Sequence, residues 1–139
     1  MLQGCAAAVA VVLAGITATP VAGQLQPPVN VPGVDRPVVV VTGEISGTMN
    51  WTSNFVYVLR GAVFVNDGAT LNIQAGTLIA GESGSVGTLI VLRGGRLNAI
   101  GTREQPIVFT SDQPVGQRAR GDWGGLILNG KAPLNIPGG

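Results

Sequence analysis

The sequence has 139 residues and a formal net charge of +1, and only 11% of its residues are charged, against about 25% in typical soluble domains. It contains no His, which excludes Ser-His and Cys-His nucleophiles and most zinc sites, and its near-neutral charge does not favour nucleic-acid binding. An apolar share of 45% excludes a disordered chain, and abundant Val, Ile and Thr predict an all-β protein.

Residues 1–23 are predicted to be a signal peptide. The run CAAAVAVVLAGI, from Cys5 to Ile16, is too short to span a bilayer as a helix but has the length of a signal-peptide core, and small residues precede Gln24. We therefore expect cleavage near Gly23 and an exported protein, secreted or on the outer cell surface. Because Cys5 precedes the apolar run instead of ending it, a lipoprotein is disfavoured, and the mature chain would contain no disulfide.

The rest of the chain divides into three parts. Residues 24–37 contain four Pro and are expected to form an extended linker. Residues 38–54 are interpreted as an N-terminal cap or edge strand. From 55 to 139, short apolar strands alternate with Gly-containing turns, and no helical period is present.

An internal repeat relates the strands of this last part. A shift of 26 residues places Val63 on Leu89, Gly68 on Gly94, and Asn72 on Asn98. A one-residue adjustment then aligns 76–77 with 101–102, and a third copy begins near Leu126. The residues expected to face inward are Val63, Val65, Leu71, Ile73, Leu89, Val91, Leu97, Ala99, Ile107, Phe109, Leu126 and Leu128.

Three short strands per repeat, joined by turns too short for a crossover helix, predict a right-handed parallel β-helix of about three to four coils. Asn72 and Asn98 would then stack as an amide ladder. The alternative is an antiparallel sandwich or barrel, which a hairpin at Asn66-Asp67-Gly68 would favour.

The chain also resembles a known group of proteins. The runs ATLNIQAGTLI, GGRLNAIGTREQPIVFTS and GDWGGLILNGKAPLN are similar to phrases in the N-terminal coils of secreted bacterial right-handed parallel β-helix proteins of uncharacterised function. The resemblance spans roughly residues 40 to 139. It implies the fold and export but no activity. Because such proteins are longer and a solenoid needs about three repeats, we expect this chain to be a fragment.

Candidate functional residues are few. Polysaccharide lyases and hydrolases of this architecture use clustered carboxylates, whereas no two carboxylates here fall at equivalent strand positions one coil apart. The loop after Ser111 supplies the candidate residues for glycan or partner contact, which are Asp112, Arg118, Arg120, Asp122 and Trp123. The alternative is a solvated loop held by ion pairs, with Trp123, like Trp51, covering the apolar interior. No catalytic residue, metal ligand or cofactor site is predicted.

These observations favour an exported, non-enzymatic scaffold, or a cell-surface module for adhesion or glycan contact. Its partner would be a surface glycan or another surface protein, and nothing indicates nucleic acid or a transmembrane domain in the mature chain. The alternative is the N-terminal part of a carbohydrate-active β-helix enzyme, a polysaccharide lyase or hydrolase, with catalytic residues downstream of Gly139.

Overall fold

The computed structural model describes residues 31–131, so the predicted signal peptide and the first half of the predicted linker, 24–30, lie outside the described residues. Within 31–131 the chain forms short strands and one turn of 3-10 helix. In chain order these elements are β1 (Val38–Ile45), β2 (Thr48–Trp51), β3 (Val56–Val65), β4 (Thr70–Ile73), β5 (Leu78–Gly81), η1 (Ser83–Ser85), β6 (Thr88–Val91), β7 (Arg96–Ala99), β8 (Val108–Ser111) and β9 (Gly125–Leu128).

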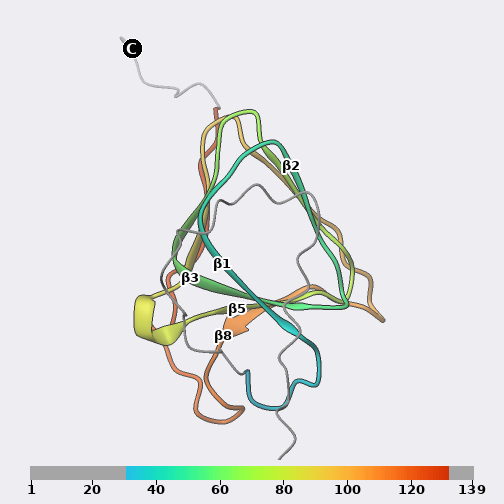
Figure 1. Cartoon of the computed structure of the whole chain (residues 1–139), viewed down its shortest axis with the longest axis vertical. Helices are drawn as coiled ribbons and strands as arrows, with labels where there is room; N and C mark the ends of the chain where they lie inside the picture. Colours follow the sequence, from blue (N-terminus) through green and yellow to red (C-terminus); the bar gives the residue numbers. More distant parts are fainter. Residues whose placement is uncertain (1–30, 132–139) are drawn as a thin grey trace, which may run out of the picture.

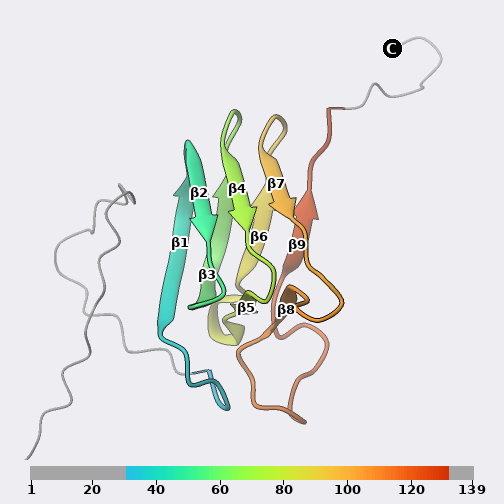
Figure 2. The ribbon, with the colours of Figure 1, turned by 90° about the vertical axis from the view of Figure 1, so that its right-hand side faces the viewer.

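Every strand pairing in the described part of the chain is parallel. β2, β4 and β7 form one three-stranded sheet, and the other strands form a six-stranded sheet around β3. Figure 2 shows strands of successive coils side by side along the axis. The turn at Asn66-Asp67-Gly68 therefore joins β3 to β4 of one coil and is not a hairpin. The antiparallel alternative is wrong, and the predicted parallel β-helix is confirmed.

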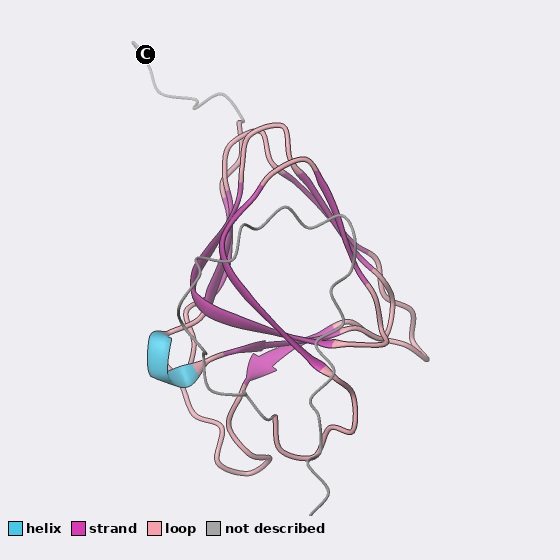
Figure 3. Ribbon diagram, viewed as in Figure 1, coloured by secondary structure: helices cyan, strands magenta, loops and turns pink. Residues whose placement is uncertain are grey.

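The coils enclose a triangle when viewed along the axis (Figures 1 and 3). The first face is built by 38–41, 56–59, β5 and β8, the second by 43–45, 62–65, β6 and β9, and the third by β2, β4 and β7. Seen with β1 nearest, the chain runs clockwise and away from the viewer, so the coil is right-handed.

The first two faces belong to one sheet because β1 and β3 bend from one face to the next without ending. β3 bends at Gly61, which adopts φ +65°, and the register between β1 and β3 shifts between Val41 and Gly43, where Gly43 has φ +73°. Residues with a Cβ rarely adopt this left-handed conformation, so Gly at these two positions lets a continuous strand turn the corner. We call this edge of the triangle the first corner.

Inward-facing side chains fill the triangle and form the core, as the alternation predicts. The predicted inward residues of the second and third coils are buried, from Val63 through Val91, and Leu97, Ile107 and Phe109 are half-buried. Ala99, Leu126 and Leu128 are exposed instead. An interior side chain is covered only where coils lie on both sides of it, and the structure describes no strand beyond β9.

The coil-to-coil register matches the 26-residue shift on two faces only. Val63 pairs with Leu89 and Asn72 with Asn98, as expected. Leu78 pairs with Val108, however, so residues 101–102 begin a longer corner loop and are not equivalent to 76–77. This alignment was wrong because corners of a β-helix change length freely, while paired strands cannot.

Residues 31–37, the end of the predicted linker, pack on the outside of the first face. Val31 is buried and forms a small apolar cluster with Val56, Val58 and Ala80, against which Val34 also packs. β3 is consequently buried on both sides along this face.

Candidate functional site

The first corner carries the densest set of polar contacts among the described residues. Arg60, which follows the first-face part of β3, forms a bidentate salt bridge with Glu82, which follows β5. Arg60 Nε lies 2.9 Å from Glu82 Oε1 and 3.0 Å from Oε2, and Nη2 lies 2.7 Å from Oε1. Ser85 Oγ donates a 2.5 Å hydrogen bond to Glu82 Oε2 and accepts one from Gly61 N–H at 2.9 Å. The network joins two consecutive coils.

The charges of this pair are mutually stabilised. The hydrogen bond from Arg60 is the main cause that lowers the pKa of Glu82, desolvation opposes it, and the Ser85 hydroxyl and the charge of Arg60 add to the lowering. The same hydrogen bond raises the pKa of Arg60, against desolvation. Because both groups stay ionised at neutral pH and are paired, they are suited to holding the corner and not to proton transfer.

The loop of 112–124 stacks on η1 and uses its two carboxylates to hold backbone. Asp112 Oδ1 accepts a 3.0 Å hydrogen bond from Ser83 N–H of the preceding coil. Asp122 Oδ2 accepts one from Ala119 N–H at 2.8 Å and one from the Ser111 hydroxyl at 3.0 Å. The two predicted carboxylates therefore fix the shape of the loop at both of its ends.

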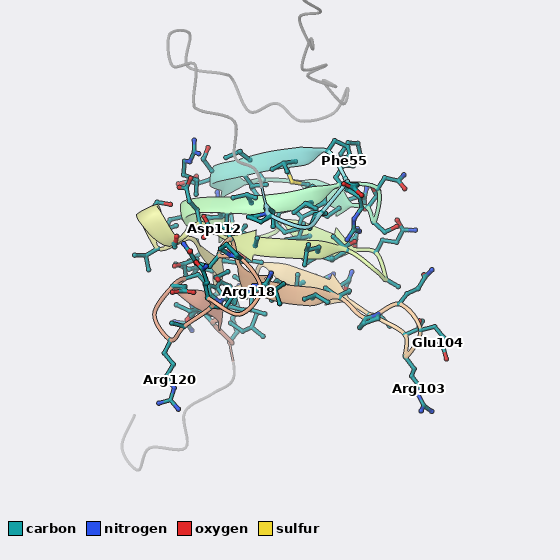
Figure 4. All side chains as sticks on the ribbon, turned by 90° about the horizontal axis from the view of Figure 1, so that it is seen from below. Phe55, Arg103, Glu104, Asp112, Arg118 and Arg120 are labelled. Atoms are coloured by element: carbon teal, nitrogen blue, oxygen red, sulfur yellow. The ribbon has the colours of Figure 1, made fainter. Side chains whose placement is uncertain are left out.

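The predicted basic and aromatic residues of this loop point in different directions. Arg118 Nε donates a 3.0 Å hydrogen bond to Gln113 O, whereas Arg120 extends away from the body of the protein (Figure 4). Trp123 is half-buried and stacks on Phe109, with ring centroids 6.5 Å apart and planes at 6°. Trp123 packs against the core, and so does Trp51, which stacks on Tyr57 at 4.7 Å.

The third face carries a row of amides along the axis. Asn72 Nδ2 donates to Asn50 Oδ1 at 2.8 Å, and Asn98 Nδ2 donates to Asn72 Oδ1 at 2.7 Å. The predicted ladder of Asn72 and Asn98 is confirmed, and Asn50 extends it to the first coil. The signal for Asn50 was present, because Thr48-Met49-Asn50 repeats the pattern of 70–72 in the preceding strand of this face. We call these three side chains the amide row.

An open groove of about 360 Å³ runs beside the amide row and crosses three coils. Its lining residues are Asn50, Trp51, Thr52, Asn72, Ile73, Gln74, Asn98 and Ile100. None of them is charged. Ile100 is 81% exposed, and Gln74 is held by a 3.2 Å hydrogen bond from Ser53 N–H to its Oε1.

A second recess, of about 660 Å³, lies where the second face turns into the third. Asp67 Oδ1 and Lys131 Nζ lie 3.5 Å apart at its edge, with side chains 74% and 58% exposed. Such solvated ion pairs contribute at most about 1 kcal/mol, so this pair does not define a built site.

The part of the chain that the structure describes contains no cluster of metal-binding side chains. No group of three or more Cys, Asp or Glu side chains there lies close enough to hold a metal ion. Among the same residues no helix is long and apolar enough to cross a membrane.

Stacked parallel strands around an apolar interior place this protein in the class of right-handed parallel β-helix proteins. The chain belongs to the pectate-lyase-like β-helix domain family, whose model matches residues 43–139. This match confirms the expected parallel β-helix relationship. No curated protein and no solved structure matches the chain.

Proposed function

We propose that this chain is an exported, non-enzymatic β-helix scaffold that contacts glycans at the cell surface. One observation carries the proposal: the carboxylates of residues 112–124, which we call the candidate loop, are engaged in hydrogen bonds that hold the loop in place. Asp112 and Asp122 accept hydrogen bonds from main-chain N–H groups and from Ser111, so neither is presented as one half of a pair flanking a glycosidic bond. Membership in a family described as pectate-lyase-like supports a carbohydrate as the partner.

Within this proposal the candidate loop has two parts. Asp112 ties the loop to the preceding coil, and Asp122 and Trp123 hold it within its own coil. Arg118 and Arg120 present exposed cations to the partner. Arg120 extends away from the body of the protein, and its side chain forms no hydrogen bond within residues 31–131. It would therefore meet an acidic group of a surface glycan or of another surface protein first.

The family description favours a second candidate, a carbohydrate-active enzyme of which this chain is a part. Catalytic carboxylates, aligned on coils that follow Gly139, would then act on a polysaccharide held against the same helix. The longer sequence separates the two candidates, because aligned Asp, Lys or Arg residues on successive later coils would identify the enzyme.

Two measurements test the leading proposal. The full chain, expressed with its own N-terminus in a bacterium, is expected outside the cytoplasm with an N-terminus at Gln24. The purified protein is expected to bind spots on an array of plant, algal and bacterial polysaccharides and to release no reducing or unsaturated ends from them. Turnover of any polysaccharide on the array would overturn the non-enzymatic assignment, and binding to none would overturn glycan contact.

A further inference from the structure

We propose that the groove beside the amide row is a binding site for an extended, uncharged polysaccharide lying parallel to the helix axis. The inference rests on the proposed glycan contact and assigns it a place and a substrate class. The site is distinct from the candidate loop at the first corner, because its lining comes from the third face.

The first argument is that the amides are oriented before any ligand arrives. Each of the two hydrogen bonds within the row uses one N–H and one oxygen lone pair, and an Asn side chain has two of each. Asn72 therefore keeps one donor and one acceptor site for a ligand while both its neighbours hold it in place. Side chains already fixed lose little rotamer freedom on binding, which reduces the entropic cost of association.

The second argument is the spacing of the row. Paired strands lie about 4.8 Å apart, so the three amides repeat at that interval along the axis. One sugar ring of an extended polysaccharide advances by a similar distance. Successive rings can therefore place a hydroxyl group opposite each of Asn50, Asn72 and Asn98, which a ligand without a repeat could not do.

The third argument is the chemistry of the lining. Hydroxyl groups both donate and accept, as amides do, and sugar rings also present C–H faces that pack against apolar side chains. Ile100, 81% exposed at one end of the groove, offers such a surface next to Asn98. Gln74 adds a fourth amide to the lining, and its Nε2 group is not used by any hydrogen bond within residues 31–131.

The lack of charge in the groove selects against acidic polysaccharides. A uronate would place a carboxylate on every sugar ring beside uncharged amide groups, and Arg96, the cation on the same strand as Asn98, lies outside the groove lining. A charged group without a matching partner weakens binding. A neutral polymer satisfies the same amides without that cost. The groove therefore favours neutral glycans, and the exposed arginines of the first corner do not contribute to it.

Binding of four named hexasaccharides to the purified full chain tests this inference. Cellohexaose, xylohexaose and mannohexaose are the neutral probes and hexagalacturonate is the acidic probe, with affinities from calorimetry. At least one neutral probe is expected to bind with an affinity that depends on the groove residues, whereas any binding of hexagalacturonate is expected to be insensitive to substitutions in the groove. Asn72→Ala is expected to weaken neutral binding about tenfold, since it removes one direct hydrogen-bonding group and the fixed orientation of two neighbours.

Controls keep the outcome interpretable. Asn66→Ala removes a half-buried Asn outside the groove, one that donates to Glu44, and is expected to leave binding unchanged. Ile100→Ser, at a side chain too exposed to support the fold, is expected to weaken binding severalfold and serves if Asn72→Ala is poorly folded. Unchanged affinity of the neutral probes in both groove variants overturns the groove but leaves glycan contact standing. Hexagalacturonate binding that both groove variants weaken overturns the selection for neutral glycans, because binding at Arg118 and Arg120 would not respond to those variants. Absence of binding to all probes and to the polysaccharide array overturns both.

Discussion

Arg60 and Glu82 lie on consecutive coils and form a bidentate salt bridge at the first corner, with Nη2 and Oε1 2.7 Å apart and side chains 17% and 18% exposed. Leu59 and Gly81, the residues just before them, are paired in the parallel ladder between β3 and β5. The ladder thus aligns the two charges, and the salt bridge in turn closes the polar corner where both strands leave the first face.

Replacing Glu82 by Gln is expected to lower the free energy of unfolding by about 1–3 kcal/mol, the range measured for hydrogen bonds to charged groups. Gln keeps the shape but leaves the largely buried Arg60 guanidinium without its counter-charge. Urea denaturation of the full chain measures the change. The matched control is Glu104→Gln, at an exposed carboxylate on the projecting loop between β7 and β8 (Figure 4), and it is expected to change stability by less than about 0.5 kcal/mol. Equal effects of the two variants would contradict the role of the salt bridge.

The same carboxylate predicts a pH dependence. The pKa of Glu82 is lower in the folded chain than the unfolded value of about 4.3, so its contribution is fully present above pH 4.3. It is lost as the pH falls through the lowered folded-state pKa. The stability difference between the wild type and Glu82→Gln is therefore expected to be constant from about pH 5 to 8 and to shrink below about pH 4. Urea titrations of both proteins at four pH values measure it, and a difference that grows in acid would contradict the assignment.

A third prediction concerns backbone strain at the same corner. Val86, which follows η1, adopts φ 53° and ψ 52°, a left-handed conformation that is unfavourable for a β-branched residue. Its side chain is 53% exposed, so a substitution removes little packing. Val86→Gly is expected to raise the free energy of unfolding by about 1 kcal/mol, since relief of strain exceeds the entropy that Gly adds to the unfolded chain. Val115→Gly, at an exposed position with no positive φ, is the control and is expected to be neutral or destabilising.

The interior was predictable from the sequence because strand pairing constrains it. Side chains alternate along a strand, and parallel pairing stacks equivalent positions of successive coils. Asn72 and Asn98 occupy equivalent positions of the repeat, and their side chains form a hydrogen bond of 2.7 Å. Asn50 lies outside the 26-residue repeat, because its strand pairs with β4 at a spacing of 22 residues.

The corners were not predictable to the same degree. Their loops vary in length between coils, and the role of a charged residue there depends on which backbone groups the next coil brings near it. Nothing in the local sequence of Asp112 shows that it accepts a hydrogen bond from Ser83 N–H of the preceding coil. Likewise, nothing near Arg60 shows that Glu82 is its partner. The charged residues of the candidate loop were found, but their division between holding the loop and facing solvent required the structure.

The last prediction concerns the contact that seats the candidate loop on the helix. Gly81 ends β5, and a Cβ there would collide with Cβ of Trp123 and approach Gly87 O to 2.9 Å. Gly81→Ala is therefore expected to lower the free energy of unfolding by about 1–3 kcal/mol, the usual cost of overpacking. Gly84→Ala is the matched control, because a Cβ at Gly84 meets nothing within 4 Å, and it is expected to be neutral or slightly stabilising.

A double variant separates the contact with Trp123 from the contact with the carbonyl. Trp123→Gly, which removes Cβ together with the indole, is expected on its own to destabilise the protein through lost packing on Phe109. If the collision with Trp123 dominates, Gly81→Ala is expected to cost less in the Trp123→Gly background than in the wild type, and urea denaturation of all four proteins gives this coupling. Additive effects would assign the cost to Gly87 O instead. In either case the absence of a side chain at Gly81 leaves room for Trp123, at the end of the loop, to approach β5 of the preceding coil.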